Sequence, residues 1–474
     1  MTNWRWIMCA MLFFATTVNY MDRQVLSLTF KEFIQPEFHW TDSDYGTITG
    51  VFSIAYAIFC LFAGKFIDWM GTKRGYLWAI IVWSFGAVLH AGCGWVTEQI
   101  VGMESKQALL EATGTIVSSI SMVSVWLFLA CRLILGLGEA GNFPAAIKVT
   151  AEYFPKKDRA FATALFNAGA SVGALAAPAT IPLLAKSLGW EMAFIIIGAL
   201  GFIWAGIWIF VYDKPAESKH VNEAELAYIN SDEEAITNQK SPITNEPQMS
   251  FLEAFKHKQT WSFAFGKFMT DGVWWFFLFW APAYFQDQYG IKASDPQGIA
   301  LIFTLYAIVT VISLFGGYLP KIFVEKHGME PYAGRMRAML IFAFFPLFAL
   351  FAQPLGGVYG PWAVAIIIGI VGAAHQSWSA NIFSTTGDMF PKSAVATITG
   401  IGAMAGGVGS FLINKGSGML FDHAAGLGEA FRFMGFSGKP AGYMIIFCIC
   451  AVAYLIGWCV MKALVPKHEP VVVE

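Results

Sequence analysis

The chain has 474 residues, of which 57 % are hydrophobic and 13 % are charged, about half the charged share of ordinary soluble domains. This composition excludes a soluble protein, and a net charge of −2 without any basic domain excludes a nucleic-acid partner. A helix that crosses a bilayer needs about 20 mostly apolar residues, so the chain is long enough for twelve spans in a lipid bilayer. Continuous apolar runs, such as 195–211 and 443–460, favour helices over the alternating strands of a barrel.

Apolar windows in chain order form two sets of six, separated by a polar stretch. We therefore predict an all-α integral membrane protein with twelve transmembrane helices in two six-helix halves. The N-terminal bundle covers 1–212, a cytoplasmic linker covers 213–258, and the C-terminal bundle covers 259–474. Residues 223–229 of the linker predict a short amphipathic helix. The windows lie near 6–31, 45–67, 75–95, 117–150, 158–184, 190–212, 260–288, 298–325, 334–353, 360–389, 394–421 and 441–464.

The distribution of lysine and arginine predicts the orientation of the chain. With both termini in the cytoplasm, nineteen of the 30 cations fall in cytoplasmic segments and six in outer loops. The first apolar stretch has no small-residue cleavage site, so it predicts an uncleaved span. We expect a multi-pass protein of the inner (plasma) membrane. The polar stretches 97–113 and 423–439 predict enlarged outer loops, to which no role is assigned.

No cofactor or metal is expected. The seven cysteines lie in apolar stretches and show neither C-x-x-C spacing nor a Cys/His cluster typical of metal and redox sites. The sequence also contains no H-E-x-x-H or G-x-S-x-G motif, which argues against a membrane-embedded enzyme.

A glycine-rich basic motif stands between the second and third spans. Its glycine permits close helix approach, its acid can interact with a helix end, and its two cations hold the turn on the cytoplasmic side. An ordinary basic turn is the alternative. The residues that carry the motif are Gly64, Asp68, Gly71, Lys73 and Arg74.

Rows of small residues predict close helix packing in three other spans. Glycine lacks a side chain, so it allows two helix backbones to approach closely. Packing is the role that these rows favour. They are Gly136, Gly138 and Gly141, then Gly169, Gly173 and Ala177, and finally Gly402, Gly406 and Gly409.

Charged residues inside the spans are the strongest functional signal. Asp22 and Arg23 fall in the first span, and Arg132 and Glu139 fall in the fourth. Each would cost about 2.5 to 3.5 kcal/mol near the bilayer centre, so each needs a partner or a wet cavity. Arg132 and Glu139 share a face but lie about 10.5 Å apart along the helix, so we expect Asp22 to partner Arg132. Tyr20 shares a helix face with Arg23. Buried salt bridges that only fix packing are the structural alternative.

Aromatic and polar residues stand together in two spans of the second half. Trp274 and Trp275 lie in the seventh span, and the string 375–381 lies in the tenth. Aromatic rings beside amides and hydroxyls can stack on the apolar face of a polyol and bind its edge. Lipid-facing or packed tryptophans and a core histidine are the alternatives. The candidate contacts in the string are His375, Gln376, Ser379 and Asn381.

Several of these strings together resemble the anion:cation symporter family of the major facilitator superfamily, in particular its hexuronate transporter branch. The loop motif resembles the signature of that superfamily, with Trp69 where a basic residue is common. Ala170 stands where relatives of the galactonate type carry glutamine, which favours hexuronate. The matching strings are Asn-Tyr-x-Asp-Arg at 19–23, the stretch 132–144, 166–169, Trp274 with Trp275, and 375–381.

The resemblance implies inward symport of a sugar-acid substrate with protons as the coupling ion, by alternating access. It implies that Arg23 and Tyr20 bind the substrate carboxylate and that Asp22 and Glu139 are protonation sites. Arg132 becomes a cationic partner. The other implied substrate contacts are Asn167 and the candidates of the seventh and tenth spans. We expect the protein to act as a monomer.

Membrane electrostatics favour the same mechanism independently. An anion that enters a negative-inside cell is opposed by about 2.3 kcal/mol per charge at 100 mV, so uptake needs a co-transported cation. Arginine suits a carboxylate because it stays charged and offers a bidentate fork. Two alternatives stay open: a symporter for another organic anion, such as an aldonate or aromatic acid, and a transporter-like sensor.

Overall fold

The computed structural model describes residues 2–231, 249–316 and 318–471, and these are almost entirely helical. Each of the twelve predicted windows coincides with a long helix or with two consecutive helices. The first six are formed by α1 (Trp4–Thr29), α3 (Asp42–Met70), α4 (Thr72–Leu89) with α5 (Cys93–Val101), α7 (Ile116–Glu139) with α8 (Asn142–Tyr153), α9 (Lys156–Leu188) and α10 (Trp190–Val211). The second six are formed by α14 (Lys258–Tyr289), α15 (Pro296–Gly316) with α16 (Tyr318–His327), α17 (Pro331–Phe344) with α18 (Ala352–Tyr359), α19 (Pro361–Met389), α20 (Lys392–Leu427) and α21 (Lys439–Leu464).

Short elements connect the long helices. A π-helical turn at Phe30–Ile34 and 3-10 segments at His90–Gly92, Phe345–Phe351 and Gly428–Ala430 lie between or beside them. The remaining elements are the helices α2 (Gln35–Phe38), α6 (Lys106–Leu110), α11 (Glu223–Ile229) and α13 (Phe251–Ala254), and the strands β1 (Arg432–Phe433) and β2 (Phe436–Ser437).

Ten helical stretches in the described part of the chain are long and apolar enough to cross a membrane. The other two long helices of the twelve, α1 and α14, are not among them. Both carry charges, the buried Asp22 and Arg23 in α1 and the buried Lys267 with the partly exposed Asp271 in α14, which lower their mean hydropathy. Ionisable groups do not by themselves exclude a span, because the stretch Ile116–Tyr153 carries Arg132 and Glu139 and is among the ten.

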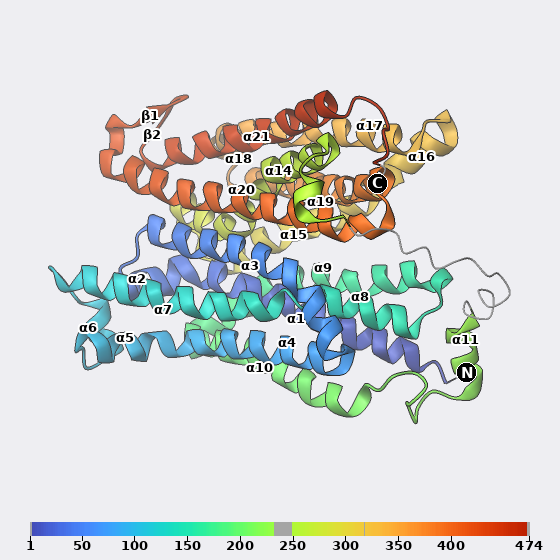
Figure 1. Cartoon of the computed structure of the whole chain (residues 1–474). Coiled ribbons are helices and arrows are strands. Elements are labelled where there is room, and N and C mark those ends of the chain that lie inside the picture. Colours follow the sequence, from blue (N-terminus) through green and yellow to red (C-terminus); the bar gives the residue numbers. More distant parts are fainter. Residues whose placement is uncertain (1, 232–248, 317, 472–474) are drawn as a thin grey trace. The chain divides into compact units, whose positions relative to one another are not determined.

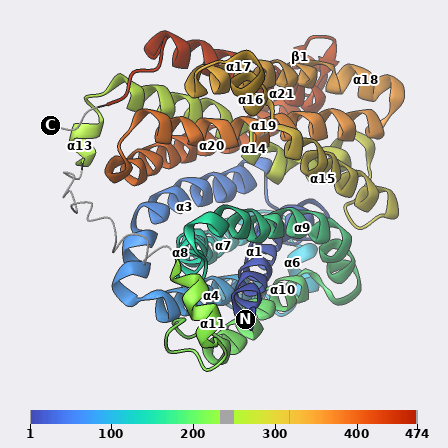
Figure 2. The same cartoon turned by 90° about the vertical axis from the view of Figure 1, so that its right-hand side faces the viewer.

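Contacts between Cα atoms divide the chain into two units. In unit 1, α10 packs against α4 and α9; in unit 2, α14 packs along α20 and α21, and α15 packs along α19 (Figures 1 and 2). The predicted boundaries 1–212, 213–258 and 259–474 stay a prediction. Unit 1 comprises Met1–Leu26, Ile58–Gln99 and Trp126–Asn245, and unit 2 comprises Ser27–Ala57, Ile100–Val125 and Glu246–Glu474.

The predicted small-residue rows lie at close helix contacts. A Cβ on Gly138 of α7 would lie 2.3 Å from the backbone nitrogen of Trp83 in α4. A Cβ on Gly173 of α9 would lie 2.3 Å from the carbonyl oxygen of Thr17 in α1, and one on Gly409 of α20 would lie 2.1 Å from that of Phe268. Only glycine fits such contacts without a shift of the backbone, so the packing prediction is confirmed at these positions.

The two enlarged loops and the linker contain short structured elements. The stretch 97–113 contains the end of α5 and helix α6, where Lys106 lies 2.9 Å from Glu37. The stretch 423–439 contains the hairpin β1–β2, which pairs Arg432 with Ser437. The amphipathic helix predicted at 223–229 is confirmed as α11. Residues 232–248 of the predicted linker lie outside the described residues.

Candidate functional site

A buried ion pair joins α1 to α7 in unit 1. Arg23 Nε lies 2.8 Å from Glu139 Oε2, with side chains that are 6 % and 0 % exposed. The guanidinium carbon of Arg23 also lies 5.2 Å from the centre of the Tyr20 ring. The phenol and guanidinium that the spacing places on one face therefore do converge, and Glu139 supplies the counter-charge from the fourth span.

Asp22 lies beside this pair and contacts a residue that the sequence analysis did not single out. Its Oδ2 accepts a hydrogen bond of 2.6 Å from Trp83 Nε1 of α4. Arg132 acts electrostatically on both Asp22 and Glu139, and its expected partnership with Asp22 stays a prediction. An indole N–H in an otherwise apolar span was the signal for Trp83, because a buried indole usually finds an acceptor.

Two carboxylate oxygens of this cluster face no donor. Asp22 Oδ1 and Glu139 Oε1 are buried without a hydrogen-bond partner among the described residues. A buried unpaired acceptor is costly, and a proton on either carboxyl would lower that cost. The cluster thus holds two carboxylates and two guanidinium groups inside the spans of unit 1.

Asn167 lies on α9, in a part of the helix that packs against α1 near Phe13. Its residue is exposed, and it stands two positions before Gly169, whose Cβ would lie 2.4 Å from the carbonyl oxygen of Phe13. Among the described residues, none forms a hydrogen bond with the Asn167 amide, and its role as a substrate contact stays a prediction.

The predicted aromatic and polar set of the second half is partly brought together in unit 2. Trp274 stacks on His375, with ring centres 5.5 Å apart and planes 2° from parallel. A 2.7 Å hydrogen bond joins His375 Nδ1 to the Tyr454 hydroxyl of α21. Ser379 lies one turn after His375 and is half-buried, as is Gln376.

Trp275 faces other aromatic residues. Its ring centre lies 6.2 Å from Phe52 and 6.3 Å from Tyr56, both of α3, and 5.3 Å from Phe279. All four residues belong to unit 2. The two neighbouring tryptophans thus lie in different surroundings, because successive residues on a helix point about 100° apart.

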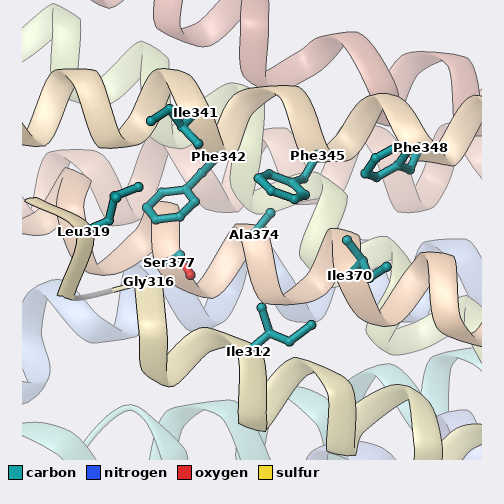
Figure 3. A pocket seen from close by; sticks show the side chains of 10 residues that line it. All are labelled: Ile312, Gly316, Leu319, Ile341, Phe342, Phe345, Phe348, Ile370, Ala374 and Ser377. Carbon is teal, nitrogen blue, oxygen red and sulfur yellow. The ribbon is translucent and has the colours of Figure 1, made fainter.

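Asn381 lies on a different side of α19 from His375. Its amide nitrogen donates a 2.8 Å hydrogen bond to the Ser377 carbonyl oxygen, and the residue lines a groove with Lys321 and Arg335. Ser377 itself lines an apolar groove of about 380 Å³ between α15, α17 and α19 (Figure 3). The string 375–381 therefore points in several directions and does not form one surface.

Lys267 and Asp271 form a second buried ion pair that the sequence analysis missed. Lys267 Nζ lies 2.8 Å from Asp271 Oδ2, with side chains that are 5 % and 15 % exposed. Lys267 Nζ also lies 4.2 Å from the centre of the Phe383 ring of α19. The spacing of four residues was the available signal, since residues i and i+4 meet on one helix face.

The loop motif forms two ion pairs in unit 1. Asp68 lies 2.7 Å from Lys148 Nζ, and Lys73 Nζ lies 2.8 Å from Asp213. Gly71 begins the turn with a φ of +80°, a conformation that favours glycine, and Arg74 is exposed. Gly64 does not lie at a close helix contact among the described residues, because a Cβ there would meet no atom within 4 Å.

A ring of four charges closes another part of unit 2. Lys31 Nζ lies 3.1 Å from Asp42 Oδ1 and 3.0 Å from Asp287 Oδ1. Lys439 Nζ lies 2.6 Å from Asp287 Oδ2 and also contacts Asp42 Oδ2. Tyr443 donates a further hydrogen bond of 2.8 Å to Asp287. The ring ties together the starts of α3 and α21 and the end of α14.

Comparison with known proteins finds a family and named relatives. The family model of the Major Facilitator Superfamily matches residues 12–413. The Hexuronate transporter of Escherichia coli (strain K12) is 28 % identical over 422 residues, which cover 88 % of each chain. The Galacturonate transporter of Dickeya chrysanthemi is 28 % identical over 320 residues, which cover 67 % of this chain and 82 % of the relative.

A solved structure shows the same fold at low sequence identity. The crystal structure of a D-xylose-proton symporter superposes with a TM-score of 0.66 and 15 % identity, covering 98 % of this chain and 97 % of the other. This likeness supports the fold alone, and it agrees with the predicted all-α membrane architecture.

Proposed function

The chain belongs to the Major Facilitator Superfamily, and we propose that it is a symporter that imports a sugar acid together with protons. It is thus a multi-pass membrane transporter and not an enzyme. The proposed substrate is a hexuronate, galacturonate or glucuronate, which the names of the two relatives and the strings shared with that branch support.

The observation that carries the proposal is the Arg23–Glu139 ion pair. Arg23 is the group we assign to the substrate carboxylate, yet in this structure it lies 2.8 Å from Glu139. When a proton from outside binds the Glu139 carboxylate, the ion pair loses its attraction and the guanidinium becomes available. The substrate carboxylate then forms the bidentate contact that arginine favours. One proton and one carboxylate enter together, so the net charge of the site does not change.

Asp22 offers a second proton site in the same cluster. It accepts a hydrogen bond from Trp83 and lies in the field of Arg132. One proton per monovalent anion makes uptake electroneutral, and a second proton would let the membrane potential drive uptake at about 2.3 kcal/mol per charge at 100 mV.

The sugar body of the substrate is assigned to the second half. Trp274 with its stacked partner His375 offers a flat apolar face with polar edges, which suits a sugar ring. Tyr20 and Arg132 complete the carboxylate end, and the remaining proposed contacts are Asn167, Trp275, Gln376, Ser379 and Asn381.

The proposed location is the inner (plasma) membrane, with both termini and the linker in the cytoplasm. The excess of lysine and arginine in the segments assigned to that side supports this orientation. The motif Gly64, Asp68, Gly71, Lys73 and Arg74 is then a cytoplasmic loop of the first half and the proposed gating motif. The protein is proposed to act as a monomer.

Uptake of labelled galacturonate and glucuronate into proteoliposomes under an inward proton gradient tests the function. We expect accumulation that a protonophore abolishes and that unlabelled galactonate does not inhibit. Transport of galactonate or another organic acid in place of both hexuronates would keep the mechanism and contradict the substrate. Binding without any uptake would identify a sensor.

A further inference from the structure

The Lys267–Asp271 pair lies deep inside a span. Helix α14 has 32 residues, and a rise of 1.5 Å per residue places Asp271 about 4 Å from its midpoint. Ionisable residues at this depth are expensive to bury, and those that occur usually face a cavity or a transport pathway. The depth of the pair therefore calls for a functional reason.

Helix packing does not supply that reason. Both charges belong to one helix, so the ion pair itself does not join α14 to another helix. A buried ion pair is weak evidence for stability, because apolar residues of similar volume often serve as well or better. By contrast, the Arg23–Glu139 pair joins two helices and so also contributes to their packing.

The carboxylate is the more accessible member of the pair. The side chain of Asp271 is 15 % exposed, whereas that of Lys267 is 5 % exposed and covered by the Phe383 ring. The neighbouring helix α20 leaves room for the carboxylate, because a Cβ on Gly406 would lie 2.2 Å from Asp271 Oδ2. A ligand that reaches this pair meets Asp271 first, and the smallest ligand for a carboxylate is a proton.

Lys267 has a second favourable contact besides Asp271. The face of the Phe383 ring attracts the ammonium at 4.2 Å, so Lys267 retains one favourable contact without its counter-ion. The groups that packed helices present to the pair are His375 of α19, on which Lys267 acts electrostatically, and Tyr454 of α21, on which Asp271 acts. From α20 the nearest group is the glycine named above, which carries no charge.

Other charges on the elements that pack against α14 have partners of their own. Lys31 of the π-helical turn lies in the four-charge ring, and Glu32 accepts a 2.7 Å hydrogen bond from Ser294. Tyr306 of α15 contacts Trp274 edge-on. The charge balance of the pair is therefore set by Lys267, Asp271, and the two neighbours His375 and Tyr454.

We propose that Asp271 is a further proton-coupling site, whose protonation breaks the ion pair and frees Lys267 for an oxygen of the substrate. The proton comes from outer water and binds Asp271 Oδ2, and no other reactant is needed. This inference rests on the proposed function, because it adds a proton site in the second half to the two assigned in the first.

Proton uptake upon substrate binding tests the proposal on the full-length protein. Galacturonate binding is measured by titration calorimetry in buffers of different ionisation enthalpy, which gives the number of protons taken up per bound substrate. We expect Asp271→Asn to take up about one proton fewer than the wild type. We expect Lys267→Met to show the same decrease, because Asp271 without its counter-ion would already be protonated. Asp271→Glu should restore the wild-type number.

A matched control separates this role from a structural one. Lys258 and Glu469 form an ion pair of 2.7 Å that is 47 % and 55 % exposed, and Glu469→Gln should leave proton uptake unchanged. An unchanged proton number in both Asp271→Asn and Lys267→Met, beside a wild type that takes up protons, would overturn the proposal alone. A wild type that binds the hexuronate without any proton would overturn the proposed function as well.

Discussion

The Arg23–Glu139 pair joins α1 to α7 across 116 residues of sequence, whereas the Lys267–Asp271 pair closes one turn of α14. Both have a shortest distance of 2.8 Å, and in both the cation also lies over an aromatic ring. The difference lies in what depends on each pair. Breaking the first pair releases a contact between two helices, and breaking the second changes only the charge on one helix face.

The largest expected effect is that of Arg23→Gln. The variant removes the assigned carboxylate donor and leaves Glu139 buried without its counter-charge, a change that costs about 3 to 5 kcal/mol. We expect hexuronate counterflow to fall by about 100-fold or more. Arg337→Gln is the control, because Arg337 is exposed and contacts Met329 and the Phe323 ring. Wild-type counterflow in Arg23→Gln would contradict the assignment of Arg23 to the substrate carboxylate.

The next largest effect is expected for variants of Glu139 and Asp22, which should lose the coupling of transport to protons more than they lose substrate binding. Glu139→Gln cannot be charged or discharged, and Asp22→Asn keeps an oxygen that can accept the Trp83 hydrogen bond. We expect accumulation driven by a proton gradient to fall about tenfold more than counterflow does in each variant. Full proton-driven accumulation in both variants would show that these acids do not couple transport to protons.

The sequence was sufficient for the long helices and for some contacts, but not for the pairing across helices. Apolar runs set the twelve windows, and the single-helix spacing of Tyr20 and Arg23 correctly predicted their contact. The partner of Glu139 could not be chosen from spacing, since the relative rotation and depth of α1 and α7 depend on packing at many positions. Charge balance alone allowed either Arg23 or Arg132 to be the partner of Glu139.

The Lys267–Asp271 pair lies within one helix, so its contact could be predicted from the spacing of the two residues. Its spacing of four residues is visible in the sequence, but Trp274 and Trp275 on the same helix are the stronger sequence signal for a sugar site. The string 375–381 was recognised as a unit by its order, although a helix points its residues around the full circle. His375 and Asn381 therefore lie against different neighbours, which only the three-dimensional packing reveals.

A smaller effect tests the hydrogen bond that distinguishes Asp22 from Glu139. Trp83→Phe leaves Asp22 Oδ2 without its 2.6 Å donor, which should lower stability by about 1 to 3 kcal/mol. The midpoint of thermal unfolding in detergent measures the change. Trp78→Phe is the matched control, because Trp78 lies on the same helix and is 49 % exposed. Equal midpoints for the two variants would contradict the importance of the bond.

The linker helix α11 also contacts a span of unit 1. The fully buried Glu225 side chain of α11 accepts hydrogen bonds of 3.1 Å from the backbone nitrogens of Trp4 and Arg5, at the start of α1. Although burial opposes it, hydrogen bonds from Thr2 and from these nitrogens lower the pKa of the Glu225 carboxyl. Its stabilising contribution is thus present above the ordinary glutamate pKa of about 4.3 and is lost as the pH falls through the lowered value.

We therefore expect Glu225→Gln to loosen the start of α1 at neutral pH. Hydrogen exchange of the first turn of α1 should become about tenfold faster, while the centre of the helix keeps its rate. Glu223→Gln, two residues earlier on α11, serves as the control because Glu223 is exposed. Equal exchange rates in the two variants would show that the linker helix does not hold α1.

The smallest expected effect lies at the corresponding edge of unit 2, where the C-terminal tail contacts α19. His468 lies 2.9 Å from the Asp388 carbonyl oxygen and also contacts the Glu330 carboxylate. The bond to Asp388 raises the pKa of His468, burial opposes the shift, and Glu330 adds to it. A raised pKa stabilises the fold below the ordinary value of about 6.5, and this contribution disappears as the pH rises through the raised value.

Since Glu330 is 52 % exposed, the contribution of His468 to the free energy of unfolding should stay below about 1 kcal/mol. His468→Gln should therefore lower the unfolding midpoint at pH 6 and leave it unchanged at pH 9, whereas the exposed His423→Gln should shift neither. A difference that persists at pH 9 would assign the contact to packing and not to charge.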